Sequence, residues 1–122
     1  ITIPMIDREK FDFIKKQYGY CASWAIWSEE DEKPKSNIGD LTILDPEINK
    51  NLLSQLNPNI VLVGLNISQR IPLPLANFHA KRPGGTDFKI RFAFRGSPYW
   101  GGYMTDIIKD FEQIFQGRWP LF

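Results

Sequence analysis

The sequence predicts an α/β domain with a small, mostly parallel sheet flanked by helices. A capped helical pattern at residues 8–18 opens the chain, and a second helical pattern at 45–56 leads into the apolar run IVLVGL at 60–65. A run that is apolar at almost every position is typical of a strand covered on both faces, as in a parallel sheet. Helix, strand and loop in this order are characteristic of α/β proteins.

The 122 residues are predicted to form a single domain, because a chain of this length buries one core. No apolar run approaches the ~20 residues that span a bilayer, and the first residues lack the basic and apolar regions of a signal peptide. Cys21 is the only cysteine, which excludes an internal disulfide and a zinc site built on a cysteine cluster. It also favours a reducing, cytoplasmic compartment. We expect no metal, no cofactor and no membrane partner.

The first helix has clear end signals. Asp7 is a good N-cap, Gly19 is a good stop, and apolar side chains repeat at helical spacing between them. The following segment, YCASWAIW at 20–27, alternates large and small residues and is predicted to be a strand. Residues 28–40 are highly charged and contain proline and glycine, so we expect an exposed loop there.

The second helix is predicted from Asp45 as N-cap and from Pro46 at the first helical position. Its apolar stripe consists of Ile48, Leu52, Leu53 and Leu56. Residues 86–95 are predicted to form a short capped helix. Two alternatives stay open for the last part of the chain, namely a helix over 105–116 or a strand at 103–108 followed by a helix.

Charge is distributed unevenly along the chain. Residues 1–60 carry 10 acidic and 7 basic side chains, whereas residues 61–122 carry 4 acidic and 8 basic ones. The net charge of +1 therefore combines −3 in the first half with +4 in the second. An anionic partner is expected to contact the second half.

Candidate ligand-contacting residues follow the apolar run. Ligands of α/β proteins gather beyond the carboxyl ends of the strands, so residues 66–86 are predicted to form a ligand-facing loop. Gly64 allows a ligand or another backbone to approach closely, and the Asn66 amide offers a donor and an acceptor to a water or a base edge. The alternative is that Asn66 and Ser68 only form a turn or cap the next element.

Basic and aromatic residues alternate in the second half of the chain, a pattern suited to phosphates and unstacked bases. The basic residues are Arg70, Lys81, Arg82, Lys89, Arg91 and Arg95, and the aromatic ones are Phe78, Phe88, Phe92, Phe94, Tyr99 and Trp100. The rings of Phe88, Phe92 and Phe94 are expected in the core or on a helix face. Phe78 is different because it lies among loop residues.

His79 is the only histidine and a candidate general acid or base. No carboxylate or nucleophile stands near it in the sequence to orient it, so a packing or hydrogen-bonding role is the simpler interpretation. The chain has no phosphate-binding or dinucleotide-binding fingerprint and no nucleophile elbow around a serine. Nucleotide-cofactor binding and serine hydrolysis are therefore unsupported.

The segment VLVGLNIS and the downstream NFH resemble the uracil-DNA glycosylase superfamily. That family has a Gly-x-Asn motif, or a variant of it, at the carboxyl end of its first core strand, and Gly64, Leu65 and Asn66 match it. An aromatic residue about a dozen positions later stacks on the extruded base in that family, and Phe78 stands twelve positions after Asn66. The Pro-Gly that follows the motif in the mismatch-specific branch is replaced here by Ile-Ser.

The resemblance implies a three-layer fold and a pocket that receives an extruded nucleotide. Asn66 would be the catalytic residue, because it would position the water that attacks the sugar carbon. The implied substrate-binding residues are Gly64, Leu65, Ser68, Phe78, His79, Arg82, Lys89 and Arg91, the last three as phosphate contacts. The implied partner is DNA, or a free nucleobase or nucleotide.

The family's second motif is a histidine-containing loop that lies farther along than the 56 residues that follow Asn66 here. The fold implied is therefore an incomplete uracil-DNA glycosylase-like fold. Two functions stay open: a DNA N-glycosylase-type hydrolase, and a binding domain that keeps the base pocket without the chemistry. A structural, oligomer-forming domain is the third, in which a second copy of the chain completes the core. The missing motif favours binding over hydrolysis.

Overall fold

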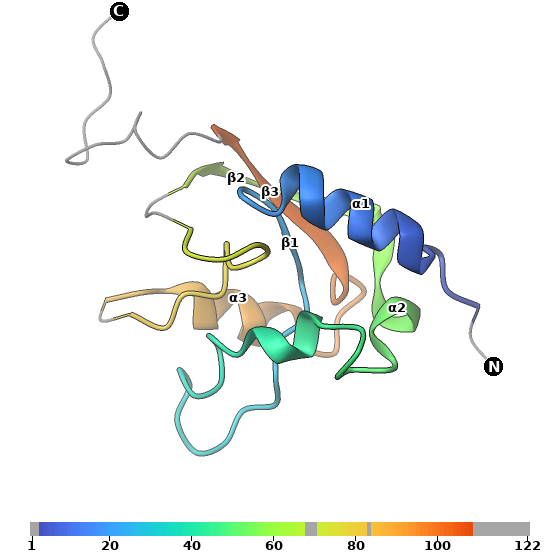
Figure 1. The fold of residues 1–122 in the computed structure, drawn as a ribbon. Coiled ribbons are helices and arrows are strands. Elements are labelled where there is room, and N and C mark those ends of the chain that lie inside the picture. The colour runs from blue at the N-terminus through green and yellow to red at the C-terminus, as the bar shows by residue number, and fades with distance from the viewer. Residues whose placement is uncertain (1–2, 68–70, 83, 109–122) are drawn as a thin grey trace, which may run out of the picture.

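The described residues of the chain fold into a mixed α/β arrangement around a three-stranded sheet (Figure 1). The computed structural model describes residues 3–67, 71–82 and 84–108. Its strands are β1 (Ser23–Trp24), β2 (Asn57–Asn66) and β3 (Gly102–Ile108), in the order β1-β3-β2. β2 and β3 are parallel, whereas β1 is antiparallel to β3. The α/β prediction is therefore confirmed, and the sheet is mixed rather than mostly parallel.

The helical elements of the described residues are α1 (Arg8–Tyr18), a 3-10 turn (Leu41–Leu44), α2 (Leu52–Gln55) and α3 (Asp87–Phe94). α1 has the predicted ends. The Asp7 carboxylate accepts a 2.7 Å hydrogen bond from the Lys10 N–H, and the Gly19 N–H donates to the Lys15 carbonyl at 2.9 Å. The helix predicted at 86–95 is confirmed as α3. None of the helices in the described part of the chain has the length and apolarity needed to cross a bilayer.

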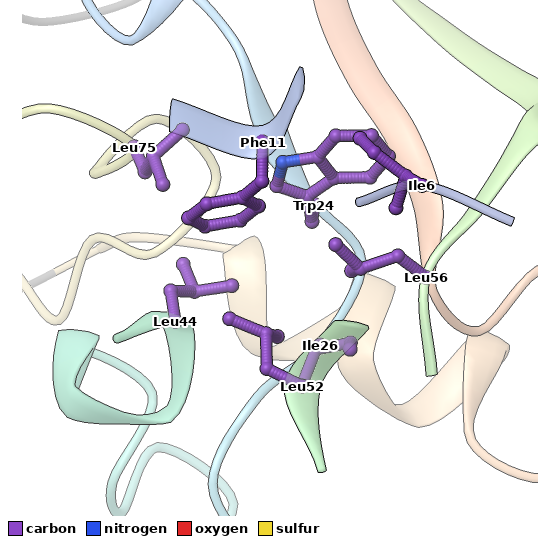
Figure 2. Packing of buried hydrophobic residues seen from close by; sticks show 8 residues of the cluster. All are labelled: Ile6, Phe11, Trp24, Ile26, Leu44, Leu52, Leu56 and Leu75. Carbon is purple, nitrogen blue, oxygen red and sulfur yellow. The ribbon is translucent and has the colours of Figure 1, made fainter. Parts of the chain in front are cut away.

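The main apolar core lies between α1, β1 and the short helical turns (Figure 2). It contains Ile6, Phe11, Trp24, Ile26, Leu44, Leu52, Leu56 and Leu75. The buried rings of Phe11 and Trp24 stack with 6.5 Å between their centroids, and Tyr103 of β3 meets Trp24 edge-on at 5.3 Å. Burial of one large apolar side chain contributes roughly 1.5–3 kcal/mol, so this cluster fixes α1 on the sheet.

A second apolar cluster joins the sheet to α3. Its buried members are Ala25, Trp27, Ile38 and Met104, and half-buried side chains of β2 and α3 pack against them. Only two residues of the strand predicted at 20–27 are regular strand, although residues 21–27 are all buried. Ala25 still runs beside β3, because it donates to the Gly102 carbonyl and accepts from the Gly101 N–H, both at 2.8 Å.

The helix predicted from Asp45 is wrong in extent. Residues 45–51 form turns, and α2 is a single helical turn. The Asn49 amide donates to the Ile43 carbonyl at 2.9 Å, and the Asn49 side-chain oxygen accepts from the Asn51 N–H at 3.3 Å. Such side-chain bonds compete with a continuous helix, and they leave Ile48 exposed.

β3 decides between the two alternatives for the end of the chain in favour of a strand at 103–108. The helix predicted beyond it, up to residue 116, lies outside the described residues. β2 confirms the strand at 60–65, but the expected cover on both faces is wrong for the described residues. Leu62 packs against the second cluster, whereas Val61, Val63 and Leu65 on the opposite face are exposed.

Candidate functional site

The carboxyl ends of β2 and β3 lie side by side and bring Gly64 next to Asp106. A Cβ atom placed on Gly64 would stand only 2.3 Å from the Asp106 Oδ1 atom. Any larger residue at position 64 would therefore displace the carboxylate. The close approach that the sequence suggested for a ligand is made here by the side chain of Asp106, which is itself buried.

Asn77 connects this carboxylate to the loop at 71–82. Its amide nitrogen donates to Asp106 Oδ2 at 2.9 Å and to the Cys21 carbonyl at 2.8 Å. Its amide oxygen accepts from the Phe78 N–H at 3.1 Å. Because Asn77 is buried, these bonds fix the loop over the end of the sheet.

Phe78 is held in a fixed position beside Gly64. Its backbone has a φ of 69°, a left-handed conformation that costs a bulky residue on the order of 1 kcal/mol. The Phe78 carbonyl accepts from Trp27 Nε1 at 3.1 Å, which secures that conformation. The half-buried ring packs on the second cluster and would lie 3.5 Å from a Cβ atom on Gly64. The ring thus borders the same strand ends as Asp106.

Asn66 is the last residue of β2, half-buried and paired with Ile108 of β3. Side chains alternate along a strand, so Asn66 shares the face of Gly64 and Asp106, whereas Leu65 belongs to the opposite face and is exposed. Ser68, which the sequence places in the site, lies outside the described residues.

A second carboxylate lies close to Asp106. Asp87, the first residue of α3, accepts from the Ala80 N–H at 2.9 Å. Burial raises the pKa of Asp87, and the nearby charge of Asp106 raises it further, while the Ala80 hydrogen bond and the charge of Arg82 act in the opposite direction. Asp87, Asp106 and Asn77 were not among the sequence-based candidates. A firm assignment of 103–108 as a strand would have placed Asp106 at this edge.

His79 lies below the loop rather than at its surface. It is 3% exposed, its Nε2 atom is 2.9 Å from the Ser23 hydroxyl, and its ring lies 5.2 Å from that of Trp27. Because the Ser23 hydroxyl donates to the Leu75 carbonyl at 2.8 Å, it accepts from an Nε2–H. Burial lowers the pKa of His79 to about 4, so the ring is neutral at pH 7. His79 therefore supports the loop and does not face a substrate.

The predicted phosphate contacts separate into two kinds. Lys89 on α3 and Arg82 in the loop are exposed. Arg91 is 1% exposed, lies 3.1 Å from Glu30 Oε1, and donates to loop carbonyls. These carbonyls belong to Ser28, Pro34 and Ser36. Arg91 therefore fixes the charged loop at 28–40 and does not reach a phosphate. Most residues of the loop at 28–40 are exposed, as the sequence predicts.

The described residues contain no group of three or more histidine, cysteine or acidic side chains placed to hold a metal ion. Comparison of the chain with protein-family models, with curated proteins and with solved structures found no match.

Proposed function

We propose that the carboxyl edge of β2 and β3 binds a nucleobase, either unstacked from DNA or as a free base or nucleotide. The observation that carries this proposal is the position of the Phe78 ring, which is half-buried and fixed beside Gly64 and Asp106. A flat ring at a strand end offers a stacking surface, and stacking contributes ~1–3 kcal/mol per base.

A polar group suited to a base edge lies on the same face of the sheet as Gly64, and basic side chains lie on the loop and the helix that follow β2. The half-buried Asn66 amide provides both a donor and an acceptor on the face of Gly64 and Asp106. Lys81, Arg82 and Lys89 are exposed and supply positive charge for phosphates. Arg91 and His79 are left out of the proposed contact surface because their side chains are buried.

The fold proposed for this function is an incomplete, three-layer, uracil-DNA glycosylase-like fold. Its support is the Gly64-x-Asn66 motif at the carboxyl end of a strand with a parallel neighbour, with Phe78 in the loop that follows. A second copy of the chain is the proposed source of any further strands.

Hydrolysis of an N-glycosidic bond is the second candidate, and the position of Asp106 favours it. A carboxylate on the same face as Asn66 suits a water molecule held between them. The water oxygen would form a bond to the sugar C1′ as the C1′–N bond breaks. The carboxylate would take the proton of the water, and the base would leave as an anion that is protonated by solvent.

The proposal is tested by fluorescence anisotropy with labelled oligonucleotides at low salt, where cation–phosphate contacts are strongest. Single- and double-stranded probes carrying uracil, hypoxanthine or a mismatch should be compared, and base release assayed in parallel. Phe78→Ala should weaken binding about 5- to 140-fold, as expected for the loss of one stacked base. Phe92→Ala is the matched control, because Phe92 is an exposed ring on α3.

Equal effects of the two substitutions would make Phe78 a packing residue only. Absence of binding to every probe, free nucleotides included, would overturn the nucleobase proposal. Base release that is lost in both Asn66→Ala and Asp106→Asn would establish the hydrolase, whereas binding without release would establish a binding domain.

A further inference from the structure

Asn77 makes three hydrogen bonds that join three separate parts of the chain. Its amide nitrogen donates to Asp106 Oδ2 of β3 at 2.9 Å and to the carbonyl of Cys21, ahead of β1, at 2.8 Å. Its amide oxygen accepts from the Phe78 N–H at 3.1 Å. The carboxylate at the strand end and the proposed stacking residue are therefore tied to one buried amide.

The chemistry of the partners fixes the orientation of this amide. A backbone carbonyl only accepts a hydrogen bond and a backbone N–H only donates one, so Cys21 requires the amide nitrogen and Phe78 requires the amide oxygen. The second hydrogen of the same nitrogen is then the one donated to Asp106. Both amide hydrogens are used within the protein, so Asn77 has no donor left for a ligand. Its contribution to a site is to place other residues.

Phe78 is the residue whose placement needs this support. Its φ of 69° lies in the left-handed region, which a bulky side chain rarely adopts. Asn77 holds the Phe78 N–H and Trp27 Nε1 holds the Phe78 carbonyl, so both peptide groups around this conformation are secured. Of these two bonds, the one to Asn77 leads on to Asp106.

We propose that Asn77 is the positioning residue of the nucleobase site, holding the Phe78 ring and the Asp106 carboxylate at a fixed separation. This role rests on the proposed function, whereas the link between the two side chains does not depend on a ligand. Asp106 belongs to β3 and Phe78 to the loop at 71–82, so their separation depends on side-chain bonds such as those of Asn77. A base stacked on Phe78 is then presented to the strand ends in one place.

Binding by Asn77→Asp, with Asn49→Asp as the matched control, tests this role with the labelled uracil, hypoxanthine and mismatch oligonucleotides. In both variants a carboxylate oxygen replaces an amide nitrogen that donates to a backbone carbonyl. Asn49 lies in the turns that precede β2, whereas the site is at the other end of that strand. At pH 8 the new carboxylate at position 77 faces Asp106 as a like charge, so we expect affinity to fall at least about tenfold. Asn49→Asp should leave affinity unchanged.

Lowering the pH should restore binding in Asn77→Asp. The titratable groups around position 77 are Asp106 of β3, Asp87 at the start of α3, Arg82 and His79 of the loop, and Cys21 ahead of β1. As the pH falls, the two facing carboxylates share a proton, and this proton replaces the lost donor. Affinity relative to the native chain at the same pH should therefore rise severalfold from pH 8 to pH 6. Urea titrations at both pH values confine the comparison to folded protein.

Hydrogen exchange of the Phe78 N–H, followed by NMR, tests the link without a ligand. Asn77→Ala removes the acceptor of this N–H, so its exchange should be at least about tenfold faster. Asp106→Ala removes only the far end of the link and should speed the same exchange severalfold through Asn77. Both rates are taken relative to the amides of β2, so that a general loss of stability does not count.

An unchanged exchange rate at Phe78 in Asp106→Ala would overturn the link, whether or not the chain binds a nucleobase. Equal affinity losses in Asn77→Asp and Asn49→Asp, or a loss in Asn77→Asp that does not recover at pH 6, would make Asn77 a structural residue only. If the native chain binds no probe, the nucleobase proposal is overturned, and the exchange rates alone decide whether Asn77 links the ring to the carboxylate.

Discussion

Arg91 and Asp106 are the two charged side chains that the described part of the fold buries almost completely, and their surroundings differ. Arg91 pairs with Glu30 and donates to three backbone carbonyls, all of them in the loop at 28–40. A guanidinium with that many protein acceptors has few donors left for a ligand. Arg91 is therefore a structural anchor.

Asp106 has a different position. It lies at the carboxyl end of a parallel strand, beside Gly64, and its neighbours include the neutral amide of Asn77. Asn66 and Phe78 border the same edge. Burial of a charge alone is thus no indication of a functional site. The location of the charge and the identity of its partners separate the two cases.

The largest expected effect is on the Arg91 anchor. Arg91→Met leaves three buried carbonyls without their donor and removes the buried cation of Glu30, which then pairs with Arg95 alone, so we expect the free energy of unfolding to fall by about 3–5 kcal/mol in urea titration. Arg95→Met is the control, because Arg95 pairs with the same Glu30 from an exposed position and should cost under about 1 kcal/mol. Similar losses in the two variants would remove the distinction between anchor and surface pair.

Disturbing the contact between Gly64 and Asp106 is expected to have the next largest effect on the free energy of unfolding. Gly64→Ala places a methyl group on the carboxylate and should lower the free energy of unfolding by about 3 kcal/mol. In the Asp106→Ala background the same substitution should cost much less, since the overlapping oxygen is gone. Additive losses in this double-mutant cycle would show that the two residues do not meet.

The buried His79 predicts a dependence of stability on pH. Its pKa is about 4 in the folded chain and about 6.5 when unfolded, so the unfolded chain binds more protons between these values. Stability is therefore lost as the pH falls through this window, by about 2 kcal/mol between pH 7 and pH 5. Urea titrations at both pH values should show this loss in the native chain and a smaller one in His79→Gln. Equal losses would place the His79 ring in contact with water.

The smallest expected effect is on oligonucleotide binding and comes from the removal of one exposed charge. Under the proposed function, Lys89→Ala should weaken oligonucleotide binding only a fewfold and lower the slope of log K against log salt by about one. Lys50→Ala, an exposed lysine in the acidic half of the chain, should leave both unchanged. Equal changes in affinity and in salt slope for Lys89→Ala and Lys50→Ala would indicate nonspecific attraction.

The local sequence signals predicted some elements correctly and one helix incorrectly. The Asp7 and Gly19 signals of α1, the strand at 60–65 and the helix at 86–95 were all predictable, because each depends on neighbouring residues alone. The helix from Asp45 failed where the Asn49 side chain took over backbone hydrogen bonds, with Ile43 on one side and Asn51 on the other. Local propensity does not show which of these bonds prevails.

The candidate site was predictable only in part. Gly64, Asn66 and Phe78 follow from the expectation that ligands meet the carboxyl end of a strand. Asp106 and Asn77 did not follow, because they depend on which strands are neighbours and on how a loop returns over them. The buried states of His79 and Arg91 likewise depend on contacts with residues more than fifty positions away.

The space that Gly64 leaves for Asp106 also defines how β2 can align with β3. A shift of β2 by one residue would set Val63 or Leu65 against the carboxylate, and a shift by two would set Leu62 or Asn66 there. Each of these side chains would occupy the volume of the Asp106 Oδ1 atom. Gly64 therefore favours the observed pairing of the two parallel strands over these shifts, and with it the position of Asn66 opposite Ile108.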